Sequence, residues 1–144
     1  MDIVMFDPEW ESLGIPRECM PQIDRELVPE FLESLDCAKE RKVMSISSIK
    51  PAQSGVLGSK VKQKTEYFLR NNRNTYTTKL YIVSKDNYLL DGHHNFVGLK
   101  LSGITEHITV TQVDMDMKEL VEVALASPLS YTQSYENLVK QQTR

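Results

Sequence analysis

The sequence has little of several residue types that would point to a particular class of protein. Its 144 residues include two cysteines and three histidines, so neither a disulfide framework nor a regularly spaced zinc site is expected. No apolar run approaches the ~18 residues that a membrane span requires. The charge excess is also small: 17 Lys and Arg against 20 Asp and Glu give a net charge of −3. This excludes a nucleic-acid binder that is basic over its whole surface, but it leaves room for a local basic patch.

The first residues, MDIVMFDPEWE, lack the basic segment and the long apolar stretch of a secretory signal peptide. We therefore expect a cytoplasmic protein with no membrane partner, in which Cys19 and Cys37 are reduced thiols. Hydrophobic residues make up 40% of the chain and charged residues 26%, a composition typical of an ordinary globular domain.

The spacing of hydrophobic residues predicts alternating helices and strands. Helices are expected over residues 25–40, 61–72, 93–103, 117–127 and 133–142. Strands are expected over residues 43–49, 77–86, 88–92 and 107–114. Asp86-Asn87 predicts a tight hairpin turn and residues 51–59 a loop. The succession predicts an α/β (α+β) fold with a small mixed sheet flanked by helices.

We expect three segments along the chain. Residues 1–40 form an N-terminal helical arm, with a short helix around Trp10 and Leu13; residues 41–127 form the domain; and residues 128–144 form a C-terminal helical arm.

One stretch carries chemistry: an apolar strand, Leu89-Leu90, runs into Asp91-Gly92-His93-His94 and then into a helix. Glycine lets the backbone approach a ligand, and the first N–H groups of a helix suit a phosphate. Imidazoles add hydrogen bonds or charge, and Asp91 could hold Mg²⁺ or accept a proton from a substrate hydroxyl. The alternative is an Asp-Gly turn that caps a helix, with both histidines in solvent.

From Ile46 to Leu101 the chain resembles the ParB/sulfiredoxin superfamily, in its branch with the Asp-Gly-His-His motif. The matching parts are SISSIKPAQ, KVKQKTEYFLRNN, KLYIVSKDNYLLDG and HHNFVGLKLSG, in the family's order. The segment IPRECMPQI is similar to the lead-in of phage-encoded relatives. The resemblance implies a compact ParB/sulfiredoxin-like domain.

The resemblance also implies that Asp91, Gly92, His93 and His94 bind nucleotide phosphates or a nucleic-acid backbone. The implied cofactors are a nucleoside di- or triphosphate and Mg²⁺, with Asp91 as the metal ligand. Sulfinic-acid reduction is not expected, because the motif has no cysteine. Centromere clamping is not expected either, because the chain lacks the Glu-Arg-Arg motif and a following helix-turn-helix domain.

Two positions depart from the family pattern. Asn95 stands where the branch usually has arginine, and a carboxamide cannot replace the bidentate contacts of a guanidinium with phosphate. Gln53 stands near where kinase relatives carry a glutamate base, and it can orient a group but cannot take a proton. Both are predicted binding residues, and both departures weaken the case for catalysis more than the case for binding.

Lysines ahead of the motif are candidate phosphate ligands, chiefly Lys60 and Lys62, with further helpers at Ser59, Lys64, Arg70 and Arg73. The alternative is that they form a solvated helix face.

Two functions follow from these observations. One is a Mg²⁺-dependent phosphotransferase or nuclease with Asp91, His93 and His94 as catalytic residues, acting on a nucleotide or a DNA backbone. The other is a non-catalytic phage accessory or host-takeover module that keeps the phosphate site and acts through a protein partner. A homodimer is compatible with either.

Overall fold

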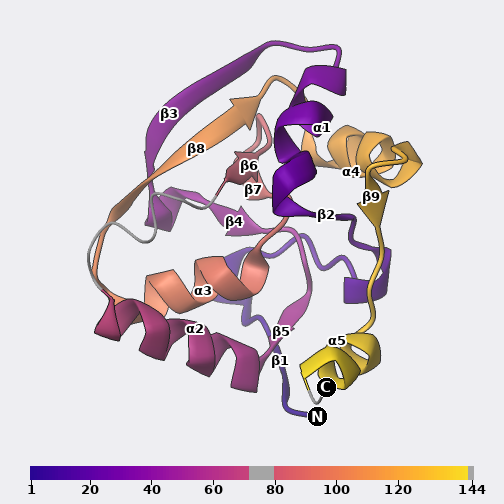
Figure 1. Cartoon of the computed structure of the whole chain (residues 1–144). Coiled ribbons are helices and arrows are strands. Elements are labelled where there is room, and N and C mark those ends of the chain that lie inside the picture. Colours follow the sequence, from indigo (N-terminus) through magenta and orange to yellow (C-terminus); the bar gives the residue numbers. More distant parts are fainter. Residues whose placement is uncertain (72–79, 143–144) are drawn as a thin grey trace.

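The computed structural model describes residues 1–71 and 80–142. A mixed sheet of five strands forms the centre of the protein. The strands lie in the order β3 (Lys39–Ser45), β8 (His107–Val113), β6 (Tyr81–Val83), β7 (Tyr88–Leu89) and β4 (Lys50–Pro51). β3–β8 and β6–β7 are antiparallel pairs, whereas β8–β6 and β7–β4 are parallel (Figure 1). This confirms the predicted α/β class with a mixed sheet.

Helices cover both faces of the sheet (Figure 1). α1 (Val28–Ser34) and α4 (Met117–Ala126) lie on one face, and α2 (Gly58–Arg70) and α3 (His93–Ser102) lie on the other. The last helix, α5 (Tyr135–Gln142), lies apart from this sheet, at the lower right of Figure 1. Successive side chains of a strand point to opposite faces, so Tyr81 and Val83 join a core with α2 and α3, whereas Ile82 joins a second core with α1 and α4.

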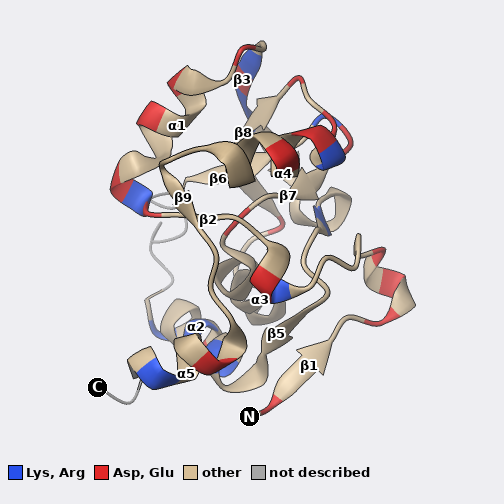
Figure 2. Ribbon diagram, turned by 90° about the vertical axis from the view of Figure 1, so that its right-hand side faces the viewer, with Lys and Arg blue, Asp and Glu red and all other residues tan. Residues whose placement is uncertain are grey.

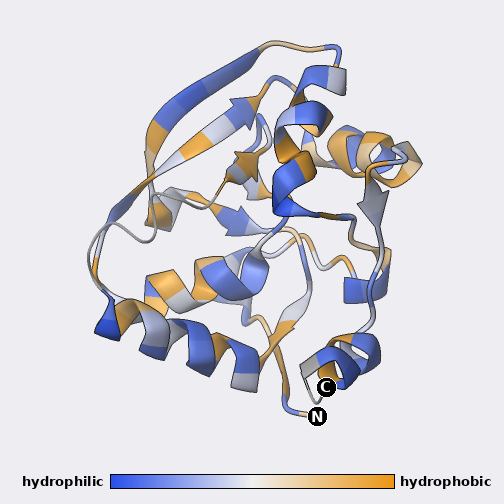
Figure 3. Ribbon diagram, in the orientation of Figure 1, coloured by the Kyte–Doolittle hydropathy of each residue, from blue (hydrophilic) through white to orange (hydrophobic). Residues whose placement is uncertain are grey.

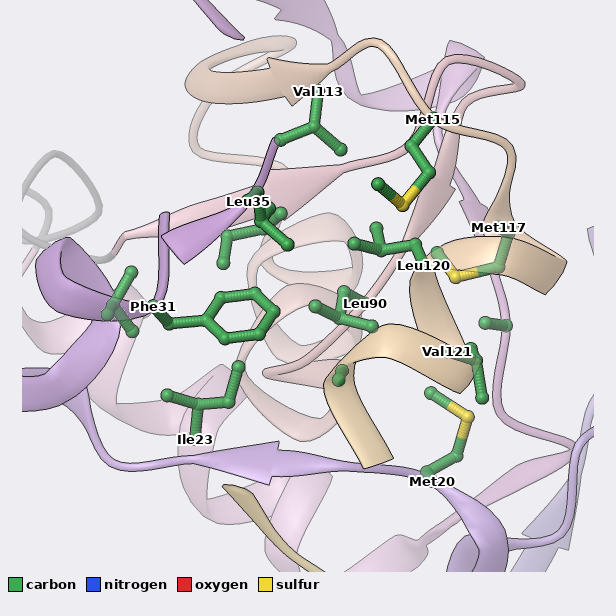
Figure 4. Close-up of a cluster of buried hydrophobic side chains, with 14 residues drawn as sticks. Met20, Ile23, Phe31, Leu35, Leu90, Val113, Met115, Met117, Leu120 and Val121 are labelled. Atoms are coloured by element: carbon green, nitrogen blue, oxygen red, sulfur yellow. The ribbon is translucent and has the colours of Figure 1, made fainter. Parts of the chain in front are cut away.

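The second core takes much of its volume from the N-terminal segment. Met20, Ile23, Phe31 and Leu35 pack there against Leu120 and other residues of α4 (Figure 4). The segment is therefore more than a helical arm, because residues 1–40 supply both core side chains and strands.

Two short sheets join the ends of the chain to the centre. β1 (Ile3–Met5) pairs antiparallel with β5 (Gly55–Leu57), and β2 (Gln22–Ile23) pairs antiparallel with β9 (Ser130–Tyr131). Neither pairing was predicted, because two- and three-residue strands show no measurable alternation.

The predicted helix over residues 25–40 is wrong in its second half. A single 3₁₀ turn, η3 (Arg25–Leu27), leads into α1, which ends at Ser34. Lys39 and Glu40 already belong to β3, where they pair with Val113 and Gln112 of β8. Pairing with a distant strand overrides the local helical spacing.

Other boundaries also differ from the prediction: in the described part of the chain, β6 covers only Tyr81–Val83 of the strand expected over 77–86, and α2 ends at Arg70. Strand β3 ends at Ser45, and a 3₁₀ turn, η4 (Ile46–Ser48), replaces the end of the strand expected over residues 43–49. The expected loop at 51–59 contains β5 and the first turn of α2. Near the N-terminus, the short helix is the 3₁₀ turn η1 (Pro8–Trp10) and does not reach Leu13. Residues 77–79 of the predicted strand 77–86 lie outside the described residues, as does Arg73.

Around the motif, the strand expected over residues 88–92 is confirmed only as β7 (Tyr88–Leu89), whereas the helix expected over residues 93–103 is confirmed to within one residue. α3 begins at His93, directly after Gly92, and it ends before Gly103, which has a positive φ of 67°. Asn87 has a φ of 69° in the turn between β6 and β7, as a tight hairpin requires. No helix in the described part of the chain combines the length and apolar character needed to cross a bilayer.

Candidate functional site

The junction between β7 and α3 places the predicted motif at the centre of a polar region. Gly92 adopts the left-handed conformation (φ 81°, ψ 30°) that glycine tolerates best, and this turns the chain into the helix. The Asp91 carboxylate holds the turn: Oδ1 accepts a hydrogen bond from the Gly92 N–H at 2.6 Å, and Oδ2 accepts one from the Ile23 N–H of β2 at 3.0 Å. Asp91 therefore connects the motif to the N-terminal segment.

His93 has a structural task. Its side chain is 3% exposed, and Nε2 accepts hydrogen bonds from the backbone N–H groups of Ala52 at 3.1 Å and Gln53 at 3.2 Å. An imidazole nitrogen that accepts from an N–H is unprotonated, so the neutral ring carries its proton on Nδ1. His93 thus fixes the segment after β4 against the start of α3.

His94 does the same for the next part of that segment. It is 6% exposed, and its Nε2 accepts a hydrogen bond from the Leu57 N–H of β5 at 2.9 Å. Burial lowers the pKa of both imidazoles to about 3, and the positive charge of Arg17 acts in the same direction. The solvated histidines of the alternative interpretation are therefore wrong, and Nε2 of each ring is not available as a catalytic base or a phosphate ligand.

The starts of α2 and α3 lie on the side of the molecule that also carries α5 (Figure 1). Residues of these three helices and of the N-terminal segment line a polar pocket of about 260 Å³. Three cations line it: Arg17 from the 3₁₀ turn η2 (Arg17–Cys19), and Lys60 and Lys64 from α2. Asp91 is the one carboxylate among its lining residues in the described part of the chain. The remaining lining residues are Gln22, Gly92, His93, His94, Asn95, Tyr131, Gln133, Leu138 and Gln141.

Arg17 is the most unusual of these residues. It is 5% exposed, and its hydrogen bonds go to two neutral amide oxygens: Nη1 donates to Gln53 Oε1 at 3.3 Å and Nη2 to Gln133 Oε1 at 3.2 Å. Nε is buried without a hydrogen-bond partner among the described residues. Burial lowers the pKa of this guanidinium, and the charge of Asp91 opposes that shift. The Tyr135 ring, 5.9 Å from the guanidinium carbon, and the charge of Asp91 offset part of the cost of this buried charge, and the unused Nε–H could donate to an anion.

The structure brings together most, but not all, of the predicted binding residues. Gly92, Asn95 and Lys60 line the pocket, and Oδ1 of Asn95 accepts a hydrogen bond from the Tyr81 hydroxyl. Gln53 is fully buried behind the pocket, where its amide donates to the Gly55 carbonyl at 2.6 Å and its oxygen accepts from Arg17. Its predicted role as a ligand is wrong; it positions Arg17 instead.

Lys62 was also predicted as a ligand, and its position excludes this. Lys60 and Lys64 are four residues apart and lie on one face of α2, whereas a residue two positions on from Lys60 points to the opposite side. Lys62 accordingly lines a separate apolar cleft next to β1. The helical period of 3.6 residues was sufficient to select Lys64 in place of Lys62.

The donor set does not fit a protein-held magnesium ion. Within residues 1–71 and 80–142, no cluster of three or more His, Cys, Asp or Glu side chains is arranged to hold a metal. Asp91 is a single carboxylate, and each of its oxygens already accepts a backbone hydrogen bond. The implied Mg²⁺ therefore does not fit the residues present at this site.

The residues that sequence reasoning missed come from segments far from the motif. Arg17 and Gln133 are 116 positions apart and meet only in the folded chain. The side-chain amide of Gln133 donates a second hydrogen bond to Gln141 Oε1 at 2.8 Å, within the C-terminal segment. No spacing rule connects these residues to Asp91.

Comparison with known proteins does not assign the chain to a family. No protein-family model, no curated protein sequence and no solved structure matches it. The resemblance to the ParB/sulfiredoxin superfamily therefore stays a prediction, and the site must be interpreted from its own geometry.

Proposed function

We propose that the polar pocket binds a phosphorylated small molecule, a nucleoside di- or triphosphate being the first candidate, and that Arg17 is its main anchor. The observation that carries the proposal is the buried guanidinium of Arg17, which bonds to neutral amides and has one donor unused. Burying an ion is costly unless an opposite charge compensates it, and a planar guanidinium matches phosphate oxygens in a bidentate manner.

The surrounding charges support the same ligand class. Lys60 and Lys64 stand beside the first residues of α3, where the helix dipole is positive. Their charges, together with that of Arg17, add to burial in lowering the pKa of His94. A positive potential of this kind attracts an anion and disfavours a cationic or neutral ligand.

The size of the pocket indicates how much of a ligand it encloses. Its volume of about 260 Å³ lies at the lower limit for small-molecule sites, which commonly span ~300–1,000 Å³. The pocket therefore suits phosphate groups and the atoms joined to them, and a nucleobase would extend beyond its rim. The resemblance to the ParB/sulfiredoxin superfamily, which implies phosphate binding at the start of this helix, points in the same direction.

Binding is a better-supported proposal than phosphotransfer or nuclease action. In both predicted catalytic histidines, Nε2 already accepts hydrogen bonds from backbone N–H groups. Asp91 lines the pocket but holds two backbone N–H groups. We therefore favour the non-catalytic alternative, a module that binds a phosphorylated ligand; its phage origin and its protein partner remain predictions.

Thermal unfolding with a ligand panel tests the proposal. The panel contains inorganic phosphate, ADP, ATP, CTP and GTP, each with and without Mg²⁺. A compound present at 100 times its dissociation constant adds about 2.7 kcal/mol of apparent stability. We expect at least one phosphate compound to raise the midpoint of wild type and to leave Arg17→Met unchanged.

The matched control is Arg41→Met, which removes an exposed arginine on strand β3 and should keep the ligand response of wild type. Lys64→Ala provides a second site variant in case Arg17→Met is unstable without ligand. The proposal is wrong if no compound stabilises wild type, or if both site variants respond like Arg41→Met.

A further inference from the structure

Strand β1 has one paired edge and one open edge. Its sheet with β5 contains no third strand in the described part of the chain, and Figure 2 shows β1 at the periphery with β5 on its inner side. The Gly58 N–H donates to the Asp2 carbonyl at 2.8 Å, and the Phe6 N–H donates to the Ser54 carbonyl at 3.1 Å. Asp2 and Phe6 therefore turn their backbone groups toward β5.

Hydrogen-bonded and non-bonded residues alternate along an antiparallel pair, so Val4, opposite Val56, also faces β5 with its backbone groups. Ile3 and Met5 lie between the bonded positions. Their N–H and C=O groups consequently point away from β5, along the open edge. The edge presents two donors and two acceptors at the spacing of a strand.

The side chains of β1 are also exposed to solvent. Ile3, Val4 and Met5 are 40%, 53% and 59% exposed. Val4 and Met5 also form the rim of an apolar cleft of about 490 Å³, which Trp10 and Leu101 help to line. Exposed apolar side chains beside an unpaired strand edge mark a surface that another strand can cover.

We propose that β1 pairs antiparallel with β1 of a second copy of this chain, about a two-fold axis at Val4. In this register Ile3 lies opposite Met5 of the second copy. The free N–H groups of each strand then face the free C=O groups of the other. Each Ile3–Met5 pair exchanges two hydrogen bonds, so the interface makes four. A two-fold contact of this type closes on itself and gives a dimer.

The charges of the strand permit this register. With Val4 at the centre, Asp2 faces Phe6 of the second copy and Asp7 faces Met1, so no two carboxylates lie opposite each other. The pairing also joins two ribbons of two strands into one sheet of four, in the order β5, β1, β1, β5. Ribbons of two strands are marginal in water, and a third or fourth strand stabilises them.

The edge strand of the main sheet, β3, differs from β1 in the charge of its side chains. β3 is also an edge, but three of its first four residues are Lys39, Arg41 and Lys42, and Figure 3 shows this part as hydrophilic. Lysine-rich edges discourage pairing with other strands. β3 nevertheless carries an exposed valine, Val43, which makes it a suitable place for a control.

Molecular mass in solution tests the dimer. Light scattering over a range of concentrations should give a wild-type mass of twice the 16.5 kDa of one chain, with dissociation on dilution. Val4→Lys places two ammonium groups side by side at the axis and should give the single-chain mass. Val43→Lys introduces the same side chain at a site that is 64% exposed and should remain a dimer.

A pair of proline variants tests the hydrogen bonds themselves. Ile3→Pro removes an N–H of the open edge and leaves the bonds to β5 in place, so the variant should be a folded monomer. Val4→Pro removes an N–H that faces β5 and should release β1 altogether, which lowers the unfolding temperature as well. A wild-type mass of one chain at every concentration overturns the proposal, as does a dimer that survives both Val4→Lys and Ile3→Pro. Binding of phosphate compounds is measured separately, because the pocket does not include β1.

Discussion

Two groups of buried polar side chains meet at the start of α3, and they differ in how completely their hydrogen bonds are made. His93 and His94 accept every hydrogen bond that their Nε2 atoms can take, all from backbone N–H groups of one neighbouring segment. Arg17, at a similar depth, donates to two amide oxygens and keeps Nε without a partner in the described residues.

This difference distinguishes the two histidines of the motif from Arg17, which comes from a distant segment. An Nε2 atom that already accepts hydrogen bonds from backbone N–H groups stabilises the folded chain and cannot accept a further one from a ligand. A buried cation with unused capacity costs stability, and an anion can offset that cost. The comparison therefore predicts that changes on the histidine side alter folding, whereas changes on the arginine side alter binding.

The largest effect is expected for His93→Ala. The change leaves the N–H groups of Ala52 and Gln53 buried without an acceptor, and each unsatisfied group costs ~1–3 kcal/mol. We expect the free energy of unfolding in urea to fall by about 3 kcal/mol. His107→Ala, which alters an exposed histidine in β8, should change it by less than about 0.5 kcal/mol. Equal losses in the two variants would remove the structural role of His93.

Acid should destabilise the protein through the same two histidines. Their pKa is about 3 in the folded chain and 6.5 in the reference state, so only the unfolded chain takes up protons as the pH falls below 6.5. Stability is therefore full above neutral pH and decreases toward acid, by roughly 1 kcal/mol for each ring between about pH 7 and 5.5.

Urea unfolding at several pH values measures this slope. His94→Gln keeps a hydrogen-bond acceptor near Leu57 but cannot titrate, so it should lose about half of the slope. If wild type and His94→Gln have parallel profiles over this range, the imidazoles are not the groups that sense the acid.

Gly98→Ala tests the packing that brings Lys64 to the pocket. A Cβ on Gly98 would lie 2.6 Å from the Lys64 Cβ and 3.1 Å from the Thr65 nitrogen, so α3 must move away from α2. We expect a loss of about 2 kcal/mol, within the range for overpacked contacts, and weaker phosphate binding. Gly103→Ala meets nothing within 4 Å and carries only the strain of its positive φ, about 1 kcal/mol. Its ligand affinity should equal that of wild type.

The smallest effect compares two lysines on one helix. Lys64→Ala removes a cation from the pocket and should weaken the best phosphate ligand about fivefold, close to 1 kcal/mol. Lys62→Ala removes a cation from the apolar cleft and should leave the affinity unchanged. Calorimetric titration of both variants decides this, and a larger loss in Lys62→Ala would place the ligand elsewhere.

Much of the fold around the motif could be predicted from local patterns. The hairpin turn at Asn87, the glycine junction at Gly92 and the end of α3 at Gly103 all depend on backbone conformations that few residue types adopt. The helix expected over 25–40 failed where β8 competes for Lys39 and Glu40, because strand pairing depends on residues distant in the sequence.

The sequence predicted several residues that line one pocket, but it did not predict the hydrogen bonds that their side chains make. Asp91, Gly92, Asn95 and Lys60 do line one pocket. The histidines looked like ligands because a sequence does not show burial, and nothing near Ala52 or Leu57 indicates that their N–H groups need a side-chain acceptor. Gln53 was predicted to contact a ligand; it does lie beside the pocket, but its side-chain oxygen accepts a hydrogen bond from Arg17.

By itself the sequence determined where α3 begins and ends and that a polar motif opens it, because glycine conformations and helical spacing depend on near neighbours. Which charged side chains reach that motif depends on tertiary packing. Arg17 and Gln133 come from opposite ends of the chain, and their contact depends on how the N-terminal and C-terminal segments pack on the sheet. Packing between distant segments also decides which polar groups are left without a partner, and that is the property from which the binding site is inferred.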